Sequence, residues 1–510
     1  MQASRTKKSI HNSTVALGYF LVSLFINFFS RKVFLDYLGT DILGLNTTAQ
    51  NLLQFLNLTE LGIGSAIGFS LYKPLQQGDE NTINEIVTLQ GKLYKRIGLI
   101  IALCGLVLMA FFPLIFKKMT LPLWYAYAAF AVFLFGSVLG YFVNYKQILL
   151  SSSQQDYKIQ YSYRTIQLIK VVCQIIAVYW LPFGYMWWLG LEVVCSSIAS
   201  WSLHRTTIKE FPTLKNVKLT FKQLRIKYHS IVVKVKQLFF HKIGGFALTQ
   251  TSPVIIYAYI NLNEVALYGN YMLIITGINQ LINAVFNSVN AGIGNLVAEG
   301  DETKIRKVFE ELLSIRFFIS ATLAAAVLFF SQPFIVVWIG EEYLLSFSTL
   351  ILLTSMLFML MVRVITDSYI NAYGLYGDIW SPIIEASLNI GLSVLLGKFF
   401  GLNGIIGGVC ISLLIIVMMW KPYYLFTRAI KGYLGRYVLS FTTNLAISIG
   451  TGFGVWYLCN SLIDGAANGF VQLVINGAIV IGFYAICLII FLAIFTPGMR
   501  YALRRFRILR

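Results

Sequence analysis

The sequence predicts an all-α polytopic membrane protein, and three properties of its composition lead to that class. Hydrophobic residues make up 57% of the 510 residues, charged residues make up only 12%, and the mean hydropathy is +0.73. A soluble chain normally has about a quarter of its residues charged. The 15% aromatic content and the 10 prolines exclude a disordered chain. The composition therefore also argues against a soluble enzyme.

About fourteen stretches are long and apolar enough to be transmembrane helices, each of which needs ~20 mostly apolar residues. The first stretch is too long for the core of a signal peptide, and Arg31 and Lys32 follow it in place of a cleavage site. It is therefore interpreted as the first span. The fourteen stretches are 12–30, 43–71, 97–116, 119–144, 160–181, 183–203, 239–260, 265–296, 313–338, 345–371, 381–398, 402–420, 438–460 and 470–495.

The distribution of basic residues predicts the orientation. Cytoplasmic loops of membrane proteins carry an excess of Lys and Arg. With the N-terminus inside, most of the 40 Lys and Arg residues lie on the cytoplasmic side. The opposite side then holds only Arg31, Lys32, Lys117, Lys118 and Lys398. Both termini are therefore expected in the cytoplasm. The net charge of +19 reflects this topology, and we expect no nucleic-acid partner.

A basic interval at 204–242 divides the first twelve spans into two sets of six. It holds ten Lys or Arg residues and one acidic residue, Glu210. Part of it alternates like a strand, but we expect a basic helix at the cytoplasmic membrane face, near anionic lipid. The predicted domains are an N-terminal six-helix lobe at 1–204, a connector at 205–238, a C-terminal six-helix lobe at 239–428, and two extra helices with a basic tail at 429–510.

The two lobes share a sequence pattern at corresponding positions. The second span ends in the motif 62–64 (Gly-Ile-Gly), and the run 78–81 (Gly-Asp-Glu-Asn) comes after it. The eighth span ends in the same tripeptide at 292–294, followed by 300–303 (Gly-Asp-Glu-Thr). Six spans in each lobe make the repeats parallel, an arrangement known in transporters. We therefore expect two six-helix lobes around a central cavity that is open to each side in turn.

Nothing in the sequence indicates a metal, a redox cofactor or an enzyme. The six cysteines fall singly within spans and form no C-x-x-C pair, and the four histidines lack metal-ligand spacing. The glycines at 62, 64 and 68 do not have the spacing of a nucleotide-binding loop, and no P-loop is present. We therefore expect no cofactor, apart from a coupling H⁺ or Na⁺.

Two predicted spans carry stripes of amide side chains at helical spacing. Polar groups in hydrocarbon are costly, so such a stripe favours a water-filled cavity. The alternative is amide hydrogen bonding between the helices of a packed bundle. The predicted substrate-binding amides are Gln50 and Asn57 in the second span and Asn283 and Asn287 in the eighth. The full stripes are Asn46, Gln50, Gln54 and Asn57, and Asn279, Asn283, Asn287 and Asn290.

Few charged residues lie within spans, and each has a structural and a functional interpretation. Arg31 either anchors the end of the first span or binds substrate, and Lys170 either extends to the cytoplasmic surface or binds substrate. Arg363 and Asp367 are four residues apart and can pair on one helix face. Asp367 is also a candidate coupling residue. Glu385 opens the eleventh span.

Glu60 is the most informative of these charges. It lies in the second span and has no basic residue three or four positions away. Its partner must therefore come from another helix, or the carboxyl titrates. Burial favours the protonated form of a carboxyl group. Glu60 is therefore a candidate coupling-proton carrier.

The first repeat resembles a known family. Residues 38–46 (LGTDILGLN) and 56–72 (LNLTELGIGSAIGFSLY) resemble the polysaccharide flippase branch of the multidrug/oligosaccharidyl-lipid/polysaccharide exporter superfamily. The order of the spans, the basic connector and the extra C-terminal pair are similar as well. The resemblance implies a V-shaped twelve-helix core with two added helices. It also implies transport of undecaprenyl-pyrophosphate-linked oligosaccharides to the outer leaflet, for O-antigen, capsule or exopolysaccharide assembly.

The chemistry of such a substrate suits the candidate residues. A pyrophosphate needs cations, for which Arg31, Lys170 and Arg363 are candidates, and glycan hydroxyls need amides. We expect a monomer in the bacterial inner membrane, in contact with membrane lipids and with polysaccharide polymerases and glycosyltransferases as further partners. The alternatives are an ion-coupled multidrug antiporter, which needs acidic cavity residues, and a membrane-embedded glycosyltransferase or polymerase. The short outside loops argue against a glycosyltransferase or polymerase.

Overall fold

The computed structural model describes residues 2–60, 63–375, 377–378 and 380–505. Within these ranges the side chains of 2–10, 58–59, 234, 236–249, 284–285 and 287–291 lie outside the description. All the regular elements of the described residues are helices, which confirms the predicted all-α class. The chain divides into two compact units, Met1–Ala266 and Leu267–Arg510. The predicted lobe boundaries at 204 and 239 stay predictions, because compact units need not coincide with repeats.

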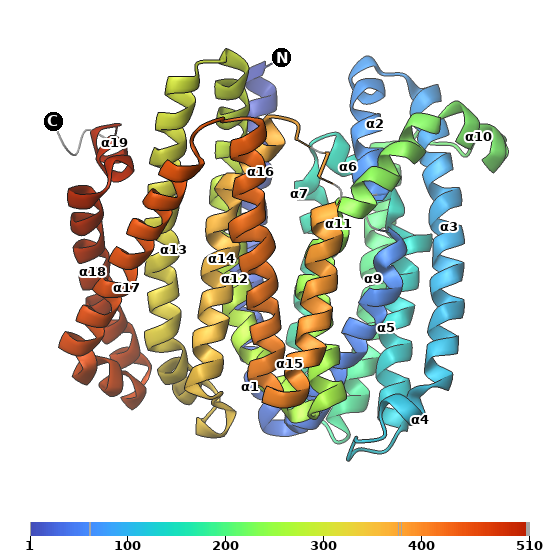
Figure 1. The fold of residues 1–510 in the computed structure, drawn as a ribbon. Coiled ribbons are helices and arrows are strands. Elements are labelled where there is room, and N and C mark those ends of the chain that lie inside the picture. The colour runs from blue at the N-terminus through green and yellow to red at the C-terminus, as the bar shows by residue number, and fades with distance from the viewer. Residues whose placement is uncertain (1, 61–62, 376, 379, 506–510) are drawn as a thin grey trace. The chain divides into compact units, whose positions relative to one another are not determined.

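The first unit combines long helices with several short ones (Figure 1). Helix α1 packs against α5, α8 and α11, and α8 packs against α9. The elements are α1 (Gln2–Leu56), η1 (Asn57–Glu60), α2 (Ile63–Gln77), α3 (Glu80–Ala110), α4 (Phe112–Ile115), α5 (Trp124–Phe142), η2 (Asn144–Gln147), α6 (Ile148–Ser152), α7 (Asp156–Ile159), η3 (Gln160–Arg164), α8 (Thr165–Trp180), α9 (Gly184–Glu210), α10 (Phe221–Lys227), α11 (His229–Tyr259) and the start of α12 (Leu262–Glu299).

The second unit is built around α13, which packs against α14, α17, α18 and α19. In Figure 1 the red helices α17 and α18 stand beside the yellow α13. The elements after α12 are α13 (Glu302–Trp338), η4 (Glu341–Tyr343), α14 (Phe347–Ala372), α15 (Trp380–Ser412), η5 (Leu413–Trp420), α16 (Lys421–Arg428), α17 (Leu434–Asp464), η6 (Gly465–Asn468), α18 (Phe470–Phe495) and α19 (Pro497–Arg505). The segments η3 and η5 are π-helical, and the other η elements are 3₁₀ turns.

The described residues hold nine helical stretches that are long and apolar enough to cross a membrane. One of them, Trp380–Arg428, contains two predicted spans, and His11–Leu56 contains the first predicted span and the first half of the second. The predicted spans at 160–181, 183–203 and 239–260 coincide with α8, α9 and α11. The chain is therefore a multi-pass membrane protein.

Glycines turn two of these long helical stretches back on themselves. Gly39 and Gly401 have non-helical backbone angles with φ of 82° and 56°. The Oγ of Ser393 donates to the carbonyl of Ile405 at 2.9 Å, although twelve residues of continuous helix would separate them by ~18 Å. The two limbs of α15 therefore form a hairpin, visible at the lower end of α15 in Figure 1.

The predicted second span at 43–71 does not form one continuous α-helix. Helix α1 ends at Leu56, a 3₁₀ turn follows at Asn57–Glu60, and α2 begins at Ile63. The Asn57 side chain accepts hydrogen bonds from Ser137 and Tyr141 of α5, and Glu60 accepts one from Tyr94 of α3. These contacts with two neighbouring helices accompany the break, which hydropathy alone does not reveal.

The basic connector is only partly helical. Residues 212–220 have no helix or strand, so the strand-like alternation there does not produce a strand. The backbone of this segment binds α3, with the N–H of Val217 donating to Thr88 and the N–H of Lys215 donating to Asn84. Between the end of α9 at Glu210 and the start of α11 at His229, the expected helix forms at α10, where Thr220 and Gln223 make a capping box. The connector is therefore bound to the first unit by specific contacts.

The repeated Gly-Asp-Glu motif has the same local structure in both units. Gly78 and Gly300 have φ of 68° and 75°, and the aspartate that follows caps the next helix, α3 or α13. A hydrogen bond from the Thr82 side chain lowers the pKa of the Asp79 carboxyl, and Thr303 does the same for Asp301. The motif is thus a helix-start signal that both units use.

The close approach of the two limbs of α15 yields a first prediction. Gly404 is buried, and a Cβ there would overlap the backbone carbonyl of Leu396, whereas a Cβ on Gly407 would meet nothing within 4 Å. Gly404→Ala should therefore lower the free energy of unfolding by about 1–3 kcal/mol, and Gly407→Ala should be neutral or slightly stabilising. Thermal unfolding in detergent measures both variants. Equal midpoints for the two would contradict the hairpin packing.

Candidate functional site

Glu60 lies in a cluster of hydroxyl groups in the first unit. The Tyr94 hydroxyl donates to the Glu60 carboxylate at 3.0 Å. Asn57, at the other end of the same 3₁₀ turn, accepts from Ser137 at 3.0 Å and from Tyr141 at 3.1 Å. The partner of Glu60 thus comes from another helix, one of the two possibilities that the sequence left open. No basic residue of the described chain pairs with this carboxylate.

Lys170 is buried and forms an ion pair between two helices. Its Nζ lies 2.7 Å from Glu192 of α9, which also accepts a hydrogen bond from Gln174 at 3.0 Å. The sequence prediction did not identify Glu192 as the partner. Because this pair neutralises Lys170 inside the first unit, the residue does not extend to the surface. Its predicted role in substrate binding therefore competes with a structural one.

Arg31 and Gln50 have different environments. The Arg31 Nη2 donates to the carbonyl of Ala266 at 3.2 Å, within the first unit. Gln50 is exposed, whereas Asn46, one helical turn before it, is buried and accepts from Tyr185 at 2.8 Å. The amides of the predicted stripe therefore divide between helix packing and an exposed position. Whether the stripe lines a cavity stays a prediction.

Four charged residues form a network in the second unit. Arg363 Nε lies 2.9 Å from Asp367, as the spacing predicted, and Arg363 Nη1 lies 3.6 Å from Glu385 of α15. Asp367 also binds Lys421, at 2.8 Å. Two acids and two bases therefore balance one another across α14, α15 and α16. Glu385 is the most deeply buried of the four, with 3% of its side chain exposed.

The pairing of these four charges bears on the roles predicted for Arg363 and Asp367. The sequence proposed Arg363 as a cation for the substrate, but two carboxylates already accompany it. Asp367 was a candidate coupling residue, yet it already pairs with two cations, Arg363 and Lys421. Both residues are brought together as predicted, within a network that explains their burial without a ligand.

A buried arginine that the sequence prediction missed lies in the same unit. Arg316 of α13 has no exposed surface. Its Nη2 donates to Asn283 at 3.2 Å, and its Nε donates to the carbonyl of Met361 at 2.7 Å. Arg316 is the fourth residue of a predicted span, where an arginine usually extends to the membrane surface. Only the packing of α12 and α14 against it reveals the burial. The side chain of Asn287, another predicted site residue, lies outside the described residues.

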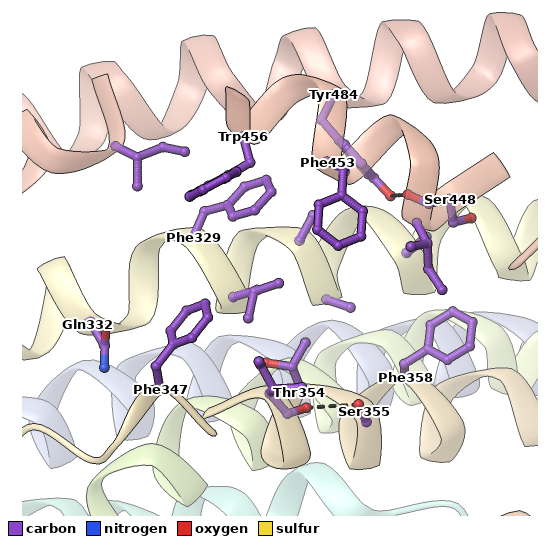
Figure 2. A pocket seen from close by; sticks show the side chains of 18 of the residues that line it. Phe329, Gln332, Phe347, Thr354, Ser355, Phe358, Ser448, Phe453, Trp456 and Tyr484 are labelled. Carbon is purple, nitrogen blue, oxygen red and sulfur yellow. Dashed lines mark hydrogen bonds between the residues drawn. The ribbon is translucent and has the colours of Figure 1, made fainter. Parts of the chain in front are cut away.

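A large apolar groove lies on the second unit, between the C-terminal helix pair and α13–α14. Its volume is about 900 Å³. Figure 2 shows Phe453 and Trp456 of α17 facing Phe329 of α13 and Phe347 of α14 across it. Phe453 is 68% exposed. A second groove of about 690 Å³ shares Leu414, Met418 and Phe441 with the first, so the two are adjacent on the unit.

Among the described residues, no three His, Cys, Asp or Glu side chains gather as metal ligands, and the six cysteines are free thiols. The described residues place buried charges, amides and hydroxyls inside the helix bundle and an apolar groove on its surface.

Solved structures of two transport proteins have a fold similar to that of this chain. A structure described as the lipid II flippase MurJ in an inward closed conformation aligns with 95% of this chain and 98% of its own, with a TM-score of 0.64 and 16% identity. An inward-facing multidrug resistance MATE family transporter of the MOP superfamily aligns with 81% of this chain and 97% of its own, with a TM-score of 0.58 and 14% identity. No family model matches, and no curated protein is similar in sequence. The fold is therefore one that MOP-superfamily transporters share.

The ion network yields a second prediction. Arg363→Met leaves Glu385 buried without a cation, which should cost about 3–5 kcal/mol of stability. Adding Glu385→Gln removes the orphan charge and should restore most of the loss, so the two changes are coupled rather than additive. Protein level and thermal unfolding in detergent give the double-mutant cycle. Strict additivity of the two changes would show that this pair does not interact.

Proposed function

We propose that this chain is a flippase that moves undecaprenyl-pyrophosphate-linked oligosaccharide units from the cytoplasmic to the outer leaflet by alternating access. The observation that carries the proposal is the apolar groove between the C-terminal helix pair and α13–α14. The likeness to a lipid II flippase over 95% of the chain adds support. In this proposal the chain works in the bacterial inner membrane with both termini in the cytoplasm, alongside polysaccharide polymerases and glycosyltransferases.

The groove suits the isoprenoid tail of such a substrate. Most of its lining side chains are aromatic or aliphatic, and several of them are exposed, including Phe453, Trp456 and Ile449. An exposed apolar lining matches a long hydrocarbon chain that stays in contact with lipid. The adjacent second groove adds apolar surface beside the first. A small drug molecule would not need an apolar surface of this extent.

The polar end of the substrate needs hydrogen-bond donors and cations. Arg31, Gln50, Asn57, Asn283 and Asn287 remain the proposed ligands for the glycan and the pyrophosphate. Lys170 and Arg363 are less suited than the sequence indicated, since acidic residues already neutralise both. They contribute to substrate binding only where a conformational change releases them.

A multidrug antiporter is the second candidate. Glu60, a carboxylate without a basic partner among the described residues, is the observation that favours it. The same residue serves the first proposal as the site of coupling to H⁺ or Na⁺. We propose Glu60 as this coupling residue in preference to Asp367, which two cations hold.

The proposed function predicts a specific defect. Cells that lack this protein should accumulate lipid-linked repeat units on the cytoplasmic leaflet, and purified protein in vesicles should move such units across the bilayer. Gly452→Trp projects into the groove and should strongly slow this transport. Gly450→Trp, two residues away and outside the groove, should not. Export of cationic drugs with no movement of lipid-linked glycan would favour the antiporter instead.

The coupling role of Glu60 is tested separately. Glu60→Gln keeps the size of the side chain and its hydrogen bond with Tyr94 but cannot ionise. Transport in vesicles should then stop responding to an imposed H⁺ or Na⁺ gradient. Tyr94→Phe keeps the carboxyl and should keep the response, so it is the matched control. A Glu60→Gln protein that still follows the gradient would remove Glu60 from the coupling mechanism.

A further inference from the structure

Arg316 is a buried cation whose hydrogen bonding is incomplete. It lies on α13, and contacts from α12 and α14 occupy part of its guanidinium. Nε donates to Met361 at 2.7 Å, Nη2 donates to Asn283 at 3.2 Å, and the guanidinium carbon lies 4.5 Å from the centre of the Phe286 ring. The remaining nitrogen, Nη1, is buried and has no hydrogen-bond partner in the part of the chain that the structure describes.

Acidic residues neutralise three other cations inside the helix bundle. Lys170 pairs with Glu192, and Arg363 and Lys421 share Asp367. No carboxylate of the described residues lies within 4.0 Å of the Arg316 guanidinium. A backbone carbonyl, an amide oxygen and a ring face offer only partial negative charge. Arg316 therefore keeps a positive charge that nothing in the described protein neutralises.

Two amide side chains of α12, Asn283 and Asn279, continue the hydrogen bonding that begins at Arg316. Asn283 uses its side-chain oxygen to accept from Arg316 and its amide nitrogen to donate to the side-chain oxygen of Asn279, at 3.2 Å. Asn279 then has its own amide N–H groups left to offer. Asn279 is only half-buried, whereas Arg316 is fully buried. The chain of hydrogen bonds thus leads from the buried cation to donors nearer the surface of the helix.

We propose that Arg316, with Asn279 and Asn283, is the binding site for a phosphate group in the second unit. The inference rests on the proposed function, because it identifies the diphosphate of the lipid-linked substrate as the anion. When Asn283 releases Nη2, the Nη1–Nη2 edge of the guanidinium is free to bind two phosphate oxygens, while Nε stays on Met361. Arginine prefers this bidentate geometry. The site is closed in the present conformation and opens when α12 moves away from α13.

Arg363 is a weaker candidate for this role. An anion that approaches it meets Asp367 and Glu385, which repel it, whereas no acidic residue of the described chain accompanies Arg316. The competing explanation for Arg316 is a brace that only joins α12, α13 and α14. A brace needs hydrogen-bond donors but no net charge, so charge-selective ligand binding distinguishes the two explanations.

The test measures ligand binding to the purified, detergent-solubilised protein by native mass spectrometry. The probes are undecaprenyl pyrophosphate, phosphatidylglycerol, and undecaprenol, which has the same tail without a charge. The variants are Arg316→Met, Arg316→Lys and Asn279→Asp. Arg306→Met is the matched control, because Arg306 is a half-buried arginine of the same helix that already has an acidic partner, Glu302.

Arg316→Met and Asn279→Asp should weaken undecaprenyl pyrophosphate binding at least tenfold, and Arg316→Lys should weaken it less. Undecaprenol and phosphatidylglycerol binding should not change in any variant, and Arg306→Met should bind all three probes normally. Unchanged binding of undecaprenyl pyrophosphate by Arg316→Met would overturn the inference. If Arg316→Met does not fold, unchanged binding by Asn279→Asp overturns it equally.

Three further outcomes separate this inference from the proposed function. An equal loss of phosphatidylglycerol binding would assign the site to phospholipid headgroups and overturn the substrate assignment. Failure of the unaltered protein to bind undecaprenyl pyrophosphate would overturn the proposed function and this inference together. Normal binding by the unaltered protein with no effect of any variant would remove only the Arg316 site.

Discussion

The cost of placing charges inside hydrocarbon-spanning helices is the constraint on which the rest of this structure depends. A buried charge without a partner on a neighbouring helix lowers the stability of the folded protein by several kcal/mol. The pair Lys170–Glu192 therefore joins α8 to α9, and the network around Arg363 joins α14 to α15 and α16. Apolar packing alone does not specify which helices are neighbours, because lipid is as apolar as the helix faces.

Irregular backbone accompanies both sets of ion pairs. The π-helical segment η5 ends immediately before Lys421, and the π-helical segment η3 immediately precedes α8, which carries Lys170. A π-helical turn adds a residue and rotates the next part of the helix, so it changes the face on which a lysine lies. Such segments are frequent at functional sites. Here they accompany charges that must meet a partner inside each unit.

Helix α13 connects the polar and apolar features of the second unit. Arg316 lies in its first half, and the groove begins five residues further on, at Ala321, and continues past Phe329. Helix α13 thus carries both a cation, Arg316, and one wall of the apolar groove. This combination suits a ligand with an anionic head group and a long apolar tail. An exchange of partners at Arg316 would therefore be coupled to the packing of the same helix against the C-terminal pair.

The sequence by itself determined the class of protein, the positions of most helices and the Arg363–Asp367 pair, because hydropathy and spacing of four residues are local properties. It also located the two Gly-Asp-Glu motifs, because the aspartate caps the first turn of the helix that follows it and this contact is local in the sequence. Only the tertiary structure decided that the second span breaks at Asn57–Glu60 and that Arg316 is buried without an acidic partner among the described residues. It alone also revealed that Lys170 is neutralised by Glu192. These features depend on contacts between residues that are distant in the sequence, and no local pattern encodes which helix face meets which.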